Sequence, residues 1–551
     1  LNLLPVQPIG GDELIVEYHV PINEVMESDI EIGEVNHDFV GIFRAAEPRD
    51  PEQSCHPNLI CYPEDIQPGS GVVALIINGT TYCTGSLVNN TSEDRTPYLL
   101  TATHCLNDNY RQSFLNNRKY DIIAGNIVAF FNYNSPVCST DIRGPLQMTL
   151  ASADSVLISE NHDISLLKLI DIPPAEYQPY FLGWNASSDA GSSSSAPFHG
   201  IHHPNGGIKK VAVEEDPLQY KSFIIDGYNI VWEPNSFWEV RNWEIAATEN
   251  GSSGSPLLDS QKRIIGTLTG GSSKCSSPRG PDLYASLHKL WNVQGSIDNP
   301  NPISYYLDPV GLGTVGLSGL NPYVHEPYTK SNNFKTDEKV SELYFESVPM
   351  FATNNTFGYT EFAEEFYAKE SVQLRGVFIS SPHTANISDK DIKIRIYTGK
   401  ESPESLIREI PYTYSYQYYS NKEFNDADRD MRHNVENYVE FANPITVIGS
   451  FYISYYESNG LPNGFATFNT EPRKPGSNII STAWMKNSTG WVRSSENLEN
   501  PVNTSLLIAP YVIGNNDIKV EPRKEETKTS VYYSGQIKRI IIESNNDLLE
   551  W

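Results

Sequence analysis

The sequence predicts an all-β protein with more than one domain. Its 551 residues exceed what a single hydrophobic core usually organises, so we expect two or three domains. Many short apolar runs, such as "VVALII" (72–77) and "ISLLKL" (164–169), alternate with Gly, Pro, Asn and Ser, a pattern typical of strands joined by turns. A hydrophobic content of 39% with 32 tyrosines also fits strand-rich globular domains. The first domain is therefore expected to be a β-barrel or β-sandwich.

Changes in composition divide the chain into five segments. The first segment is acidic and alternates polar with apolar residues, as in "LIVEYHV", which indicates strands with one exposed face. The stretch "HEPYTKSNNFKTDEK" is polar and has no periodicity, as expected of a linker, and a second set of strands follows it. The predicted segments are a strand-forming region at 1–50, an all-β domain at 51–323, a linker at 324–339, a β-sandwich at 340–513 and a charged tail at 514–551.

Charge and cysteine usage exclude several classes of protein. A net charge of −28 argues against nucleic-acid binding, which needs a basic surface, and fits a well-solvated soluble protein. No apolar run approaches the roughly 20 residues of a membrane-spanning helix. The six cysteines all lie in the first half of the chain without a CxxC pair, which favours disulfides in an exported protein over a zinc site. The sequence starts without a basic and apolar leader, so we expect any signal peptide to have been removed from it.

One segment, "NGSSGSPLL" (250–258), places a serine on a tight turn before an apolar strand. This serine, Ser255, would need a general base, a group that orients the base, and donors for an oxyanion before its hydroxyl could react. His104 ends an apolar strand and Asp163 precedes another, so both lie at strand edges. The backbone N–H groups of Ser253 and Ser255 could point at one oxygen. The residues for a catalytic triad are therefore present.

Each of these residues also has a structural alternative. A serine beside glycine is commonly part of a loop, a histidine beside cysteine commonly packs, and an aspartate before a strand commonly caps a turn. Their occurrence together, in the order His, Asp, Ser within one all-β region, favours catalysis. The competing class is an inactive, protease-like binding or adhesion protein.

Several longer motifs carry a resemblance to a known family. They are "SCHPNLIC" (54–61), "CTGSLVNNTSEDRTPYLLTATHC" (83–105), "HDISLLKL" (162–169), "GIHHPN" (200–205), "GSSGSPLLDSQKRIIGTLTGG" (251–271) and "YYLDP" (305–309). With these motifs, residues 55–323 resemble the lysyl endopeptidases, secreted bacterial serine proteases with a chymotrypsin-like double β-barrel. The resemblance implies that His104 is the general base, Asp163 its orienting partner and Ser255 the nucleophile, with oxyanion donors at Ser253 and Ser255.

The resemblance also implies a disulfide pattern and no cofactor. The six cysteines alone allow many pairings, and the family suggests Cys55–Cys275, Cys61–Cys138 and Cys83–Cys105. The adjacent histidines at 202–203 do not indicate a metal site, because neighbouring residues of a strand point to opposite faces. The family has these histidines without a catalytic metal, so we expect none here.

The expected specificity is for basic residues. A buried lysine side chain needs a carboxylate partner, and the family places an aspartate shortly after the last cysteine, which corresponds to Asp282. Glu249, six residues before Ser255, is a rival. The family also pairs a tryptophan, here Trp232, with a histidine before the Gly-Gly of the pocket strand. This sequence has Thr269 before Gly270 and Gly271, so we expect cleavage after lysine with arginine as a second substrate.

Residues 1–50 resemble the end of the prosegment in related enzymes. Trypsin-like zymogens pair a new N-terminal ammonium with an aspartate directly before the serine, and Gly254 in that place leaves no partner for it. No lysine occurs before Lys119, so we expect removal of this segment after Arg44 or Arg49. The linker lysines Lys330, Lys335 and Lys339 would allow self-release of the C-terminal half.

The C-terminal half loosely resembles β-sandwich modules of secreted proteins from Bacteroidetes, which suggests a binding or spacer role, including glycan or cell-surface contact. The segment "DADRD" (426–430) departs from a calcium loop, with Met431 in place of the glycine and Asn437 in place of the final acid. The last strand is expected to begin a sorting domain for type IX secretion. Expected partners are protein or peptide substrates with basic residues.

Overall fold

The fold is described from a computed structural model. The described residues are Val16 and the ranges 55–107, 112–115, 119–223, 231–295, 300–341, 344–345, 348–355, 357–382, 390–414, 435–457, 465–474, 477, 479–497, 500–516, 518–520, 528–533 and 536–541. The prosegment-like region 1–50, apart from Val16, and the segment 426–430 lie outside the described residues.

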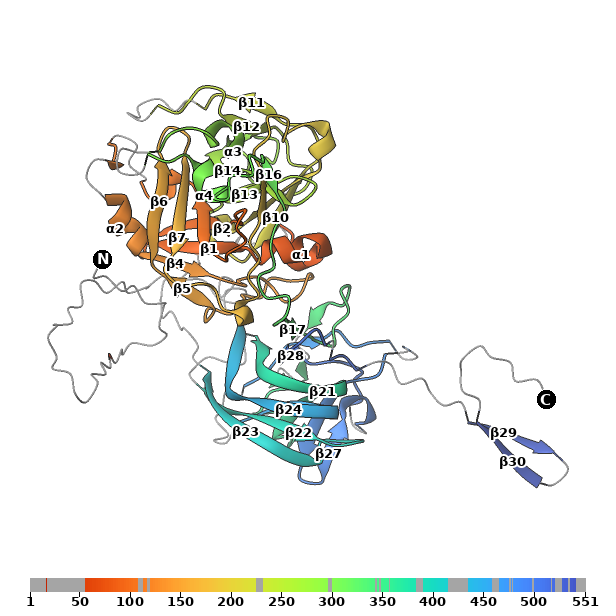
Figure 1. Ribbon diagram of the computed structural model, residues 1–551. Helices are drawn as coiled ribbons and strands as arrows, with labels where there is room; N and C mark the ends of the chain where they lie inside the picture. Colours follow the sequence, from red (N-terminus) through yellow and green to blue (C-terminus); the bar gives the residue numbers. More distant parts are fainter. Residues whose placement is uncertain are drawn as a thin grey trace, which may run out of the picture.

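Two sheets form the first unit, which lies in the upper half of Figure 1, and their strands pair antiparallel except for the parallel pair β8–β14. The first sheet has the order β5-β4-β1-β2-β3-β7-β6, and β1 pairs with β2 from Val72↔Ser86 to Ile77↔Thr81. Its strands are β1 (Val72–Ile77), β2 (Thr81–Leu87), β3 (Tyr98–Thr101), β4 (Ile127–Phe130), β5 (Thr149–Ala151), β6 (Ala153–Ser159) and β7 (Ile164–Leu169), and helix α2 (Lys119–Gly125) packs beside β6.

The second sheet follows in the chain and has the order β10-β9-β13-β14-β15-β12-β11, with β8 and β16 added at β14. Its strands are β8 (Gly183–Asn185), β9 (Phe198–His202), β10 (Lys210–Glu214), β11 (Gln219–Lys221), β12 (Phe237–Val240), β13 (Pro256–Leu258), β14 (Arg263–Gly271), β15 (Asp282–Ser286) and β16 (Gly316–Leu317). Three short helices accompany them: α1 (Pro63–Gly69), α3 (Leu287–Leu290) and α4 (Ile303–Leu307). Aliphatic and aromatic side chains from both sheets, including Leu100, Leu166, Ile201 and Ile264, share one buried cluster.

The second unit is a strongly curved antiparallel sheet around its own core. Two long strands, β21 (Glu361–Ser381) and β24 (Val435–Glu457), pair over most of their length with register shifts that bend them. The other strands are β17 (Tyr328–Lys330), β18 (Val340–Ser341), β19 (Tyr344–Phe345), β20 (Val348–Pro349), β22 (Lys390–Thr398), β23 (Ser405–Tyr414), β25 (Asn469–Thr470), β26 (Ala483–Asn487), β27 (Gly490–Arg493) and β28 (Ile508–Ile513). Near the end of the chain, β29 (Lys528–Tyr533) and β30 (Gln536–Ile541) form a hairpin.

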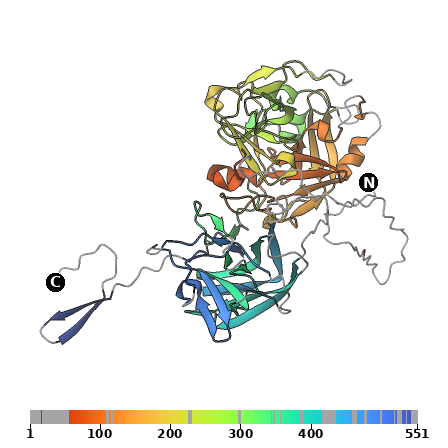
Figure 2. The same ribbon diagram turned by 180° about the vertical axis from the view of Figure 1, so that it is seen from behind.

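This architecture confirms the predicted fold class, which is all-β with a chymotrypsin-like double β-barrel followed by a β-sandwich. The rear view in Figure 2 shows the same two units in contact, with the hairpin β29–β30 apart from both. In the part of the chain that the structure describes, no helix is long and apolar enough to cross a membrane.

The sandwich packs directly on the first sheet of the barrel unit. Phe378 of β21, Tyr438 of β24 and Tyr511 of β28 are buried in the same apolar cluster as Leu167 and Phe181 of the barrel unit. The Tyr511 hydroxyl donates a hydrogen bond to the backbone carbonyl of residue 176. The two units therefore share a hydrophobic core instead of being joined only by a tether.

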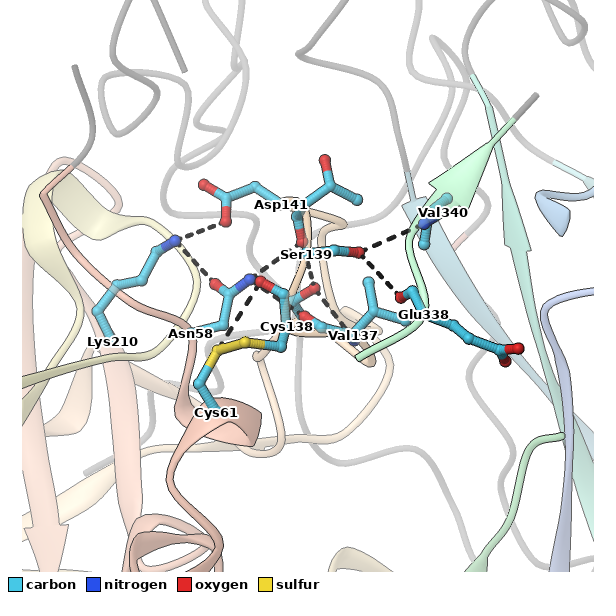
Figure 3. The surroundings of a disulfide bond; sticks show 11 residues. Asn58, Cys61, Val137, Cys138, Ser139, Asp141, Lys210, Glu338 and Val340 are labelled. Carbon is cyan, nitrogen blue, oxygen red and sulfur yellow. Dashed lines mark hydrogen bonds and ion pairs between the residues drawn. A yellow bond between two sulfur atoms is a disulfide. The ribbon is translucent and has the colours of Figure 1, made fainter. Parts of the chain in front are cut away.

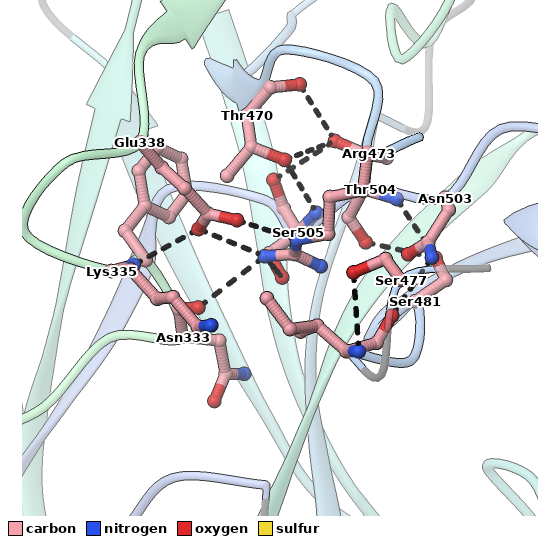
Figure 4. A network of polar contacts seen from close by, with 12 residues as sticks. Asn333, Lys335, Glu338, Thr470, Arg473, Ser477, Ser481, Asn503, Thr504 and Ser505 are labelled. Carbon is pink, nitrogen blue, oxygen red and sulfur yellow. Dashed lines mark hydrogen bonds and ion pairs between the residues drawn. The ribbon is translucent and has the colours of Figure 1, made fainter. Parts of the chain in front are cut away.

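The segment expected to be a linker takes part in this interface. Its residues Tyr328–Lys330 form β17, which pairs with β28 at the edge of the sandwich. The Lys330 ammonium lies 2.5 Å from the buried Glu436 carboxylate. Further along, the Arg473 guanidinium binds both carboxylate oxygens of Glu338, at 2.7 and 3.1 Å (Figure 4). Polar residues in this segment are therefore paired with partners in the sandwich.

The disulfides are Cys55–Cys275, Cys61–Cys138 and Cys83–Cys105, the three pairs that the resemblance implied. Figure 3 shows the surroundings of the second one, where the Asn58 side chain donates to the carbonyl of Val137 at 3.1 Å. Next to Cys138, the Ser139 hydroxyl donates to the carbonyl of Glu338 at 3.4 Å. This disulfide loop therefore contacts the segment that leads into the sandwich.

Candidate active site

Two neighbouring strands of the first sheet bring His104 and Asp163 together. His104 lies in the short turn after β3, and Asp163 immediately precedes β7. These strands are paired, with Thr101 opposite Ser165, so the ends that carry the two residues are adjacent. The backbone φ of Asp163 is 53°, a left-handed conformation that aspartate tolerates better than most residues.

The contact between them is bidentate. His104 Nδ1 lies 2.8 Å from Asp163 Oδ2, and the His104 backbone N–H donates to Oδ1 at 2.8 Å. The Asp163 side chain is fully buried, while 17% of the His104 side chain is exposed. A carboxylate on Nδ1 fixes the tautomer in which Nδ1 carries the proton, so Nε2 is available to accept one. The imidazole is thus oriented as a general base.

Ser255 is badly placed for the role that the sequence predicts for it. The residue has no exposed surface, and its Oγ is shielded from solvent without a hydrogen-bond partner at normal geometry among the described residues. A nucleophile must reach a substrate carbonyl and contact its base. Ser253, two residues earlier in the same turn, is partly exposed. The assignment of the nucleophile is therefore corrected from Ser255 to Ser253 in the proposal below.

The backbone N–H groups of this turn support the same correction. Ser252 donates to the carbonyl of Glu249, Gly254 to that of Leu268, and Ser255 to that of Ser252, at 3.1, 2.8 and 3.0 Å. The Ser255 N–H is thus engaged within the turn and is not directed at a substrate. In the described part of the chain, the N–H groups at 251 and 253 donate to no other group. Two unpaired donors two residues apart are what an oxyanion hole requires.

Packing holds the turn against the segment that carries His104. The Thr84 N–H donates to the carbonyl of Ser253 at 2.8 Å, and its neighbour Cys83 is bonded to Cys105, which follows His104. Gly254 has a φ of 80°, and a Cβ atom there would overlap the carbonyl of Thr84 and lie 2.9 Å from the N atom of residue 102. Glycine is therefore required for the close approach of these two segments.

The residues expected to bind the substrate side chain lie on β14 and β15. Gly271 is opposite Asp282 in the register of these strands, and Gly270 is opposite Leu283. Asp282 is fully buried and accepts hydrogen bonds from Trp243 Nε1 at 2.7 Å and from the Thr248 hydroxyl at 2.8 Å. Its Oδ1 faces the place where a Cβ of residue 271 would be, so a side chain there would overlap it. A buried carboxylate thus lies beneath the glycine strand.

The other expected specificity residues have different surroundings. Glu249 Oε1 accepts a hydrogen bond from the Cys275 N–H at 3.2 Å, next to the disulfide Cys55–Cys275. Trp232 stacks on Phe223 with ring centroids 4.7 Å apart. Thr269 is buried on β14 directly before Gly270 and Gly271. Phe223 is thus an aromatic partner of Trp232, and no motif in the sequence had pointed to this residue.

Two acidic or sulfur-containing clusters elsewhere have the composition of metal ligands. One consists of Cys55, His56 and Cys275, but both cysteines are bonded to each other and have no thiolate to offer. The other consists of Glu214, Asp216 and Glu244. Exposed acidic groups are common without an ion, so neither cluster is assigned as a metal site.

The two-sheet barrel architecture and the carboxylate–imidazole pair are features of the class of chymotrypsin-like serine proteases. Within that class, residues 50–285 match the family model described as "Lysyl endopeptidase, C-terminal domain". A lysyl endopeptidase from Pseudomonas aeruginosa is 25% identical over 291 residues, which cover 49% of this chain and 57% of that protein. The matched region is thus similar to the lysyl endopeptidases, and the chain spans just over half the length of that relative.

Solved structures with a similar arrangement are more distant. A protease of Mycobacterium tuberculosis, Rv3671c in its inactive form, is 16% identical with a TM-score of 0.28, covering 41% of this chain and 89% of that chain. A serine endoprotease from Yersinia pestis is 14% identical with a TM-score of 0.26, covering 45% of this chain and 66% of that chain.

Proposed function

We propose that this chain is a secreted serine endopeptidase that cleaves peptide bonds after lysine, and after arginine as a second choice. In this proposal Ser253 is the nucleophile, His104 the general base and Asp163 the residue that orients it. The N–H groups of Gly251 and Ser253 bind the oxyanion. The observation that carries the proposal is the buried Asp163 on Nδ1 of His104, together with a partly exposed serine, Ser253, whose turn has two unpaired amides among the described residues.

The reaction follows from these positions. Nε2 of His104 takes the proton of the Ser253 hydroxyl while Oγ attacks the substrate carbonyl. The negative charge that develops on the carbonyl oxygen is stabilised by the two amides, and the imidazolium by the Asp163 carboxylate. His104 then protonates the leaving amine, and water attacks the acyl-enzyme through the same base. No cofactor takes part in this scheme.

Asp282 is proposed as the group that selects a basic side chain. It is a buried carboxylate beneath the glycines of β14, and a cation that enters there would gain a charge-assisted interaction in place of its hydration. Glu249 is the alternative because its carboxylate lies on the loop before Ser253. Trp232 and Thr269 are proposed to line the same region, with the threonine leaving more room for arginine than a histidine would.

Labelling with a fluorophosphonate probe tests the proposed nucleophile. We expect the full-length wild-type protein to be labelled at Ser253, labelling to be abolished by Ser253→Ala and sharply reduced by His104→Ala. Asp163→Asn should lower kcat by about 10⁴-fold, because the imidazole would lose its preferred tautomer. Ser255→Ala is the matched control, and it should still be labelled because this serine is buried away from the substrate.

The result also separates the proposal from its competitor. A wild-type protein that is not labelled would be a protease-like binding or adhesion protein. Loss of labelling in Ser255→Ala with retention in Ser253→Ala would return the nucleophile to Ser255. The proposed export, including the type IX route, and a glycan or cell-surface contact through the sandwich are separate from this test.

A further inference from the structure

The residue directly before Ser253 is hydrogen-bonded to a buried histidine. Ser252 has no exposed surface, and its Oγ lies 2.7 Å from Nδ1 of His202, the last residue of β9. The Glu249 N–H donates to the same Oγ at 3.2 Å. A hydroxyl oxygen has one proton and two lone pairs, so Ser252 can form both bonds at once, and the tautomer of His202 decides which of the two groups donates in the bond between them.

His202 is suited to be a constant hydrogen-bond partner for Ser252. It is fully buried, and burial lowers its pKa well below the ordinary value, with the nearby charges of His56, His203 and Lys210 acting in the same direction. The imidazole packs edge-on against His56 with ring centroids 5.4 Å apart. Its neighbour His203 has a different partner, the carbonyl of Gly207, 2.8 Å from its Nδ1. The two adjacent histidines therefore have separate roles and do not form one metal site.

The other side of the nucleophile turn is held by the backbone that follows β9. Gly251 has a φ of 84°, and a Cβ atom there would lie 2.6 Å from the N atom of Gly206. The Asn205 N–H donates to the carbonyl of Asn250. The turn is thus fixed on one side by backbone contacts. Two side-chain contacts act on the peptide groups between residues 251 and 253: the Thr84 hydroxyl donates to the carbonyl of Gly251 at 2.9 Å, and His202 is bonded to the Ser252 side chain.

This arrangement does without an N-terminal activation partner. The residue before the nucleophile is a neutral serine, so it has no charge with which to attract a terminal ammonium. Its hydroxyl is already bonded to an internal imidazole. The conformation of the turn therefore depends on β9, a strand of the barrel itself.

We propose that His202 is a positioning residue for the oxyanion hole. Through its hydrogen bond to Ser252, it fixes the two peptide groups whose N–H donors are otherwise unpaired. The inference deepens the proposed function and rests on it. His202 touches neither the substrate nor the nucleophile, so its effect is on the placement of donors in the transition state.

Replacement of His202 in the full-length protein tests this role. His202→Leu should lower kcat by about 100-fold, the usual cost of misplacing or losing one oxyanion donor, with KM within about threefold of the wild-type value. A peptide aldehyde, which forms a tetrahedral adduct, should bind more weakly by a similar factor, while a substrate-like competitive inhibitor should not. His202→Asn places an amide oxygen near the position of Nδ1 and should restore most of the loss in kcat.

His199 offers a matched control on the same strand. It is also buried, and its Nδ1 lies 2.6 Å from Asp65 Oδ2, away from the nucleophile turn. His199→Leu should lower the melting temperature and leave kcat unchanged. An unchanged kcat in His202→Leu, an equal loss in His199→Leu, or no rescue by His202→Asn would overturn the proposal. A wild-type protein that fluorophosphonate does not label would refute the proposed function itself, and the role of His202 would fall with it.

Discussion

Phe378 couples the stability of the sandwich to that of the protease unit. It lies on β21 of the sandwich but is 3% exposed within the apolar cluster of the first barrel sheet. Its ring stacks on Tyr438 at 4.7 Å between centroids and meets Tyr511 edge-on at 5.2 Å. The Lys330 ammonium lies 4.1 Å from the ring centroid. Phe378→Ala should therefore remove about 3–5 kcal/mol, the usual range for a buried Phe→Ala change.

Because the loss occurs at the interface, it should appear in both units. Each unit opens locally at a free energy that includes its own stability plus the contact between them. Phe378→Ala lowers the contact contribution, so hydrogen exchange measured by mass spectrometry should show less protection in β7 and in β24 alike. Phe366→Ala is the matched control, because this ring packs on Phe451 inside the sandwich, and it should lower protection in β24 only. Unchanged protection of β7 in Phe378→Ala would refute the coupling.

Two further predictions follow from buried charges. Lys330→Met should cost about 3–5 kcal/mol of unfolding free energy because it leaves the buried Glu436 carboxylate without its cation, and Lys330→Met with Glu436→Gln should recover most of this in thermal melts. Burial raises the pKa of the Glu436 carboxyl. The loss of unfolding free energy in Lys330→Met should therefore be small below the ordinary pKa of glutamate, where the carboxyl is neutral, and should grow as the pH rises through the raised pKa of Glu436. Equal losses at pH 5 and pH 8 would contradict this. In a peptide-library digest read by mass spectrometry, Asp282→Ala should abolish cleavage after lysine while Glu249→Ala retains it, and the reverse pattern would assign the pocket to Glu249.

The sequence was sufficient for the fold class and for the His–Asp pair, for a physical reason. Short continuous apolar runs such as 98–101 and 164–169 indicate buried strands, and a polar residue that flanks such a run lies at the end of its strand. His104 and Asp163 follow and precede paired strands, so their adjacency needs only the pairing of β3 with β7. The disulfide partners needed a family resemblance, because cysteine spacing alone does not choose among pairings.

The choice between Ser253 and Ser255 could not be made from residue types. Both serines adjoin Gly254, and both precede an apolar strand, so composition treats them alike. The difference lies in the folded turn, where φ is positive at Gly251 and Gly254, Ser253 is partly exposed and Ser255 is fully buried. The signal available in the sequence was the first glycine of the motif, Gly251, since a glycine two residues before Ser253 allows the positive φ that frees alternate amides.

The segment predicted to be a linker has polar residues that are paired in the structure, which its composition did not indicate. The segment 325–339 is polar, and polarity without periodicity usually indicates exposure. Here Lys330 lies in β17 with its ammonium on a buried carboxylate, and Glu338 is bound by Arg473. A protease that cleaves after lysine needs a lysine whose side chain is free to enter the protease's pocket and whose backbone is accessible. While β17 is paired with β28, the Lys330 ammonium is bound to Glu436 and its backbone is part of a sheet. Self-release at this residue would therefore require the edge of the sandwich to open first, which costs the ion pair and part of the shared core.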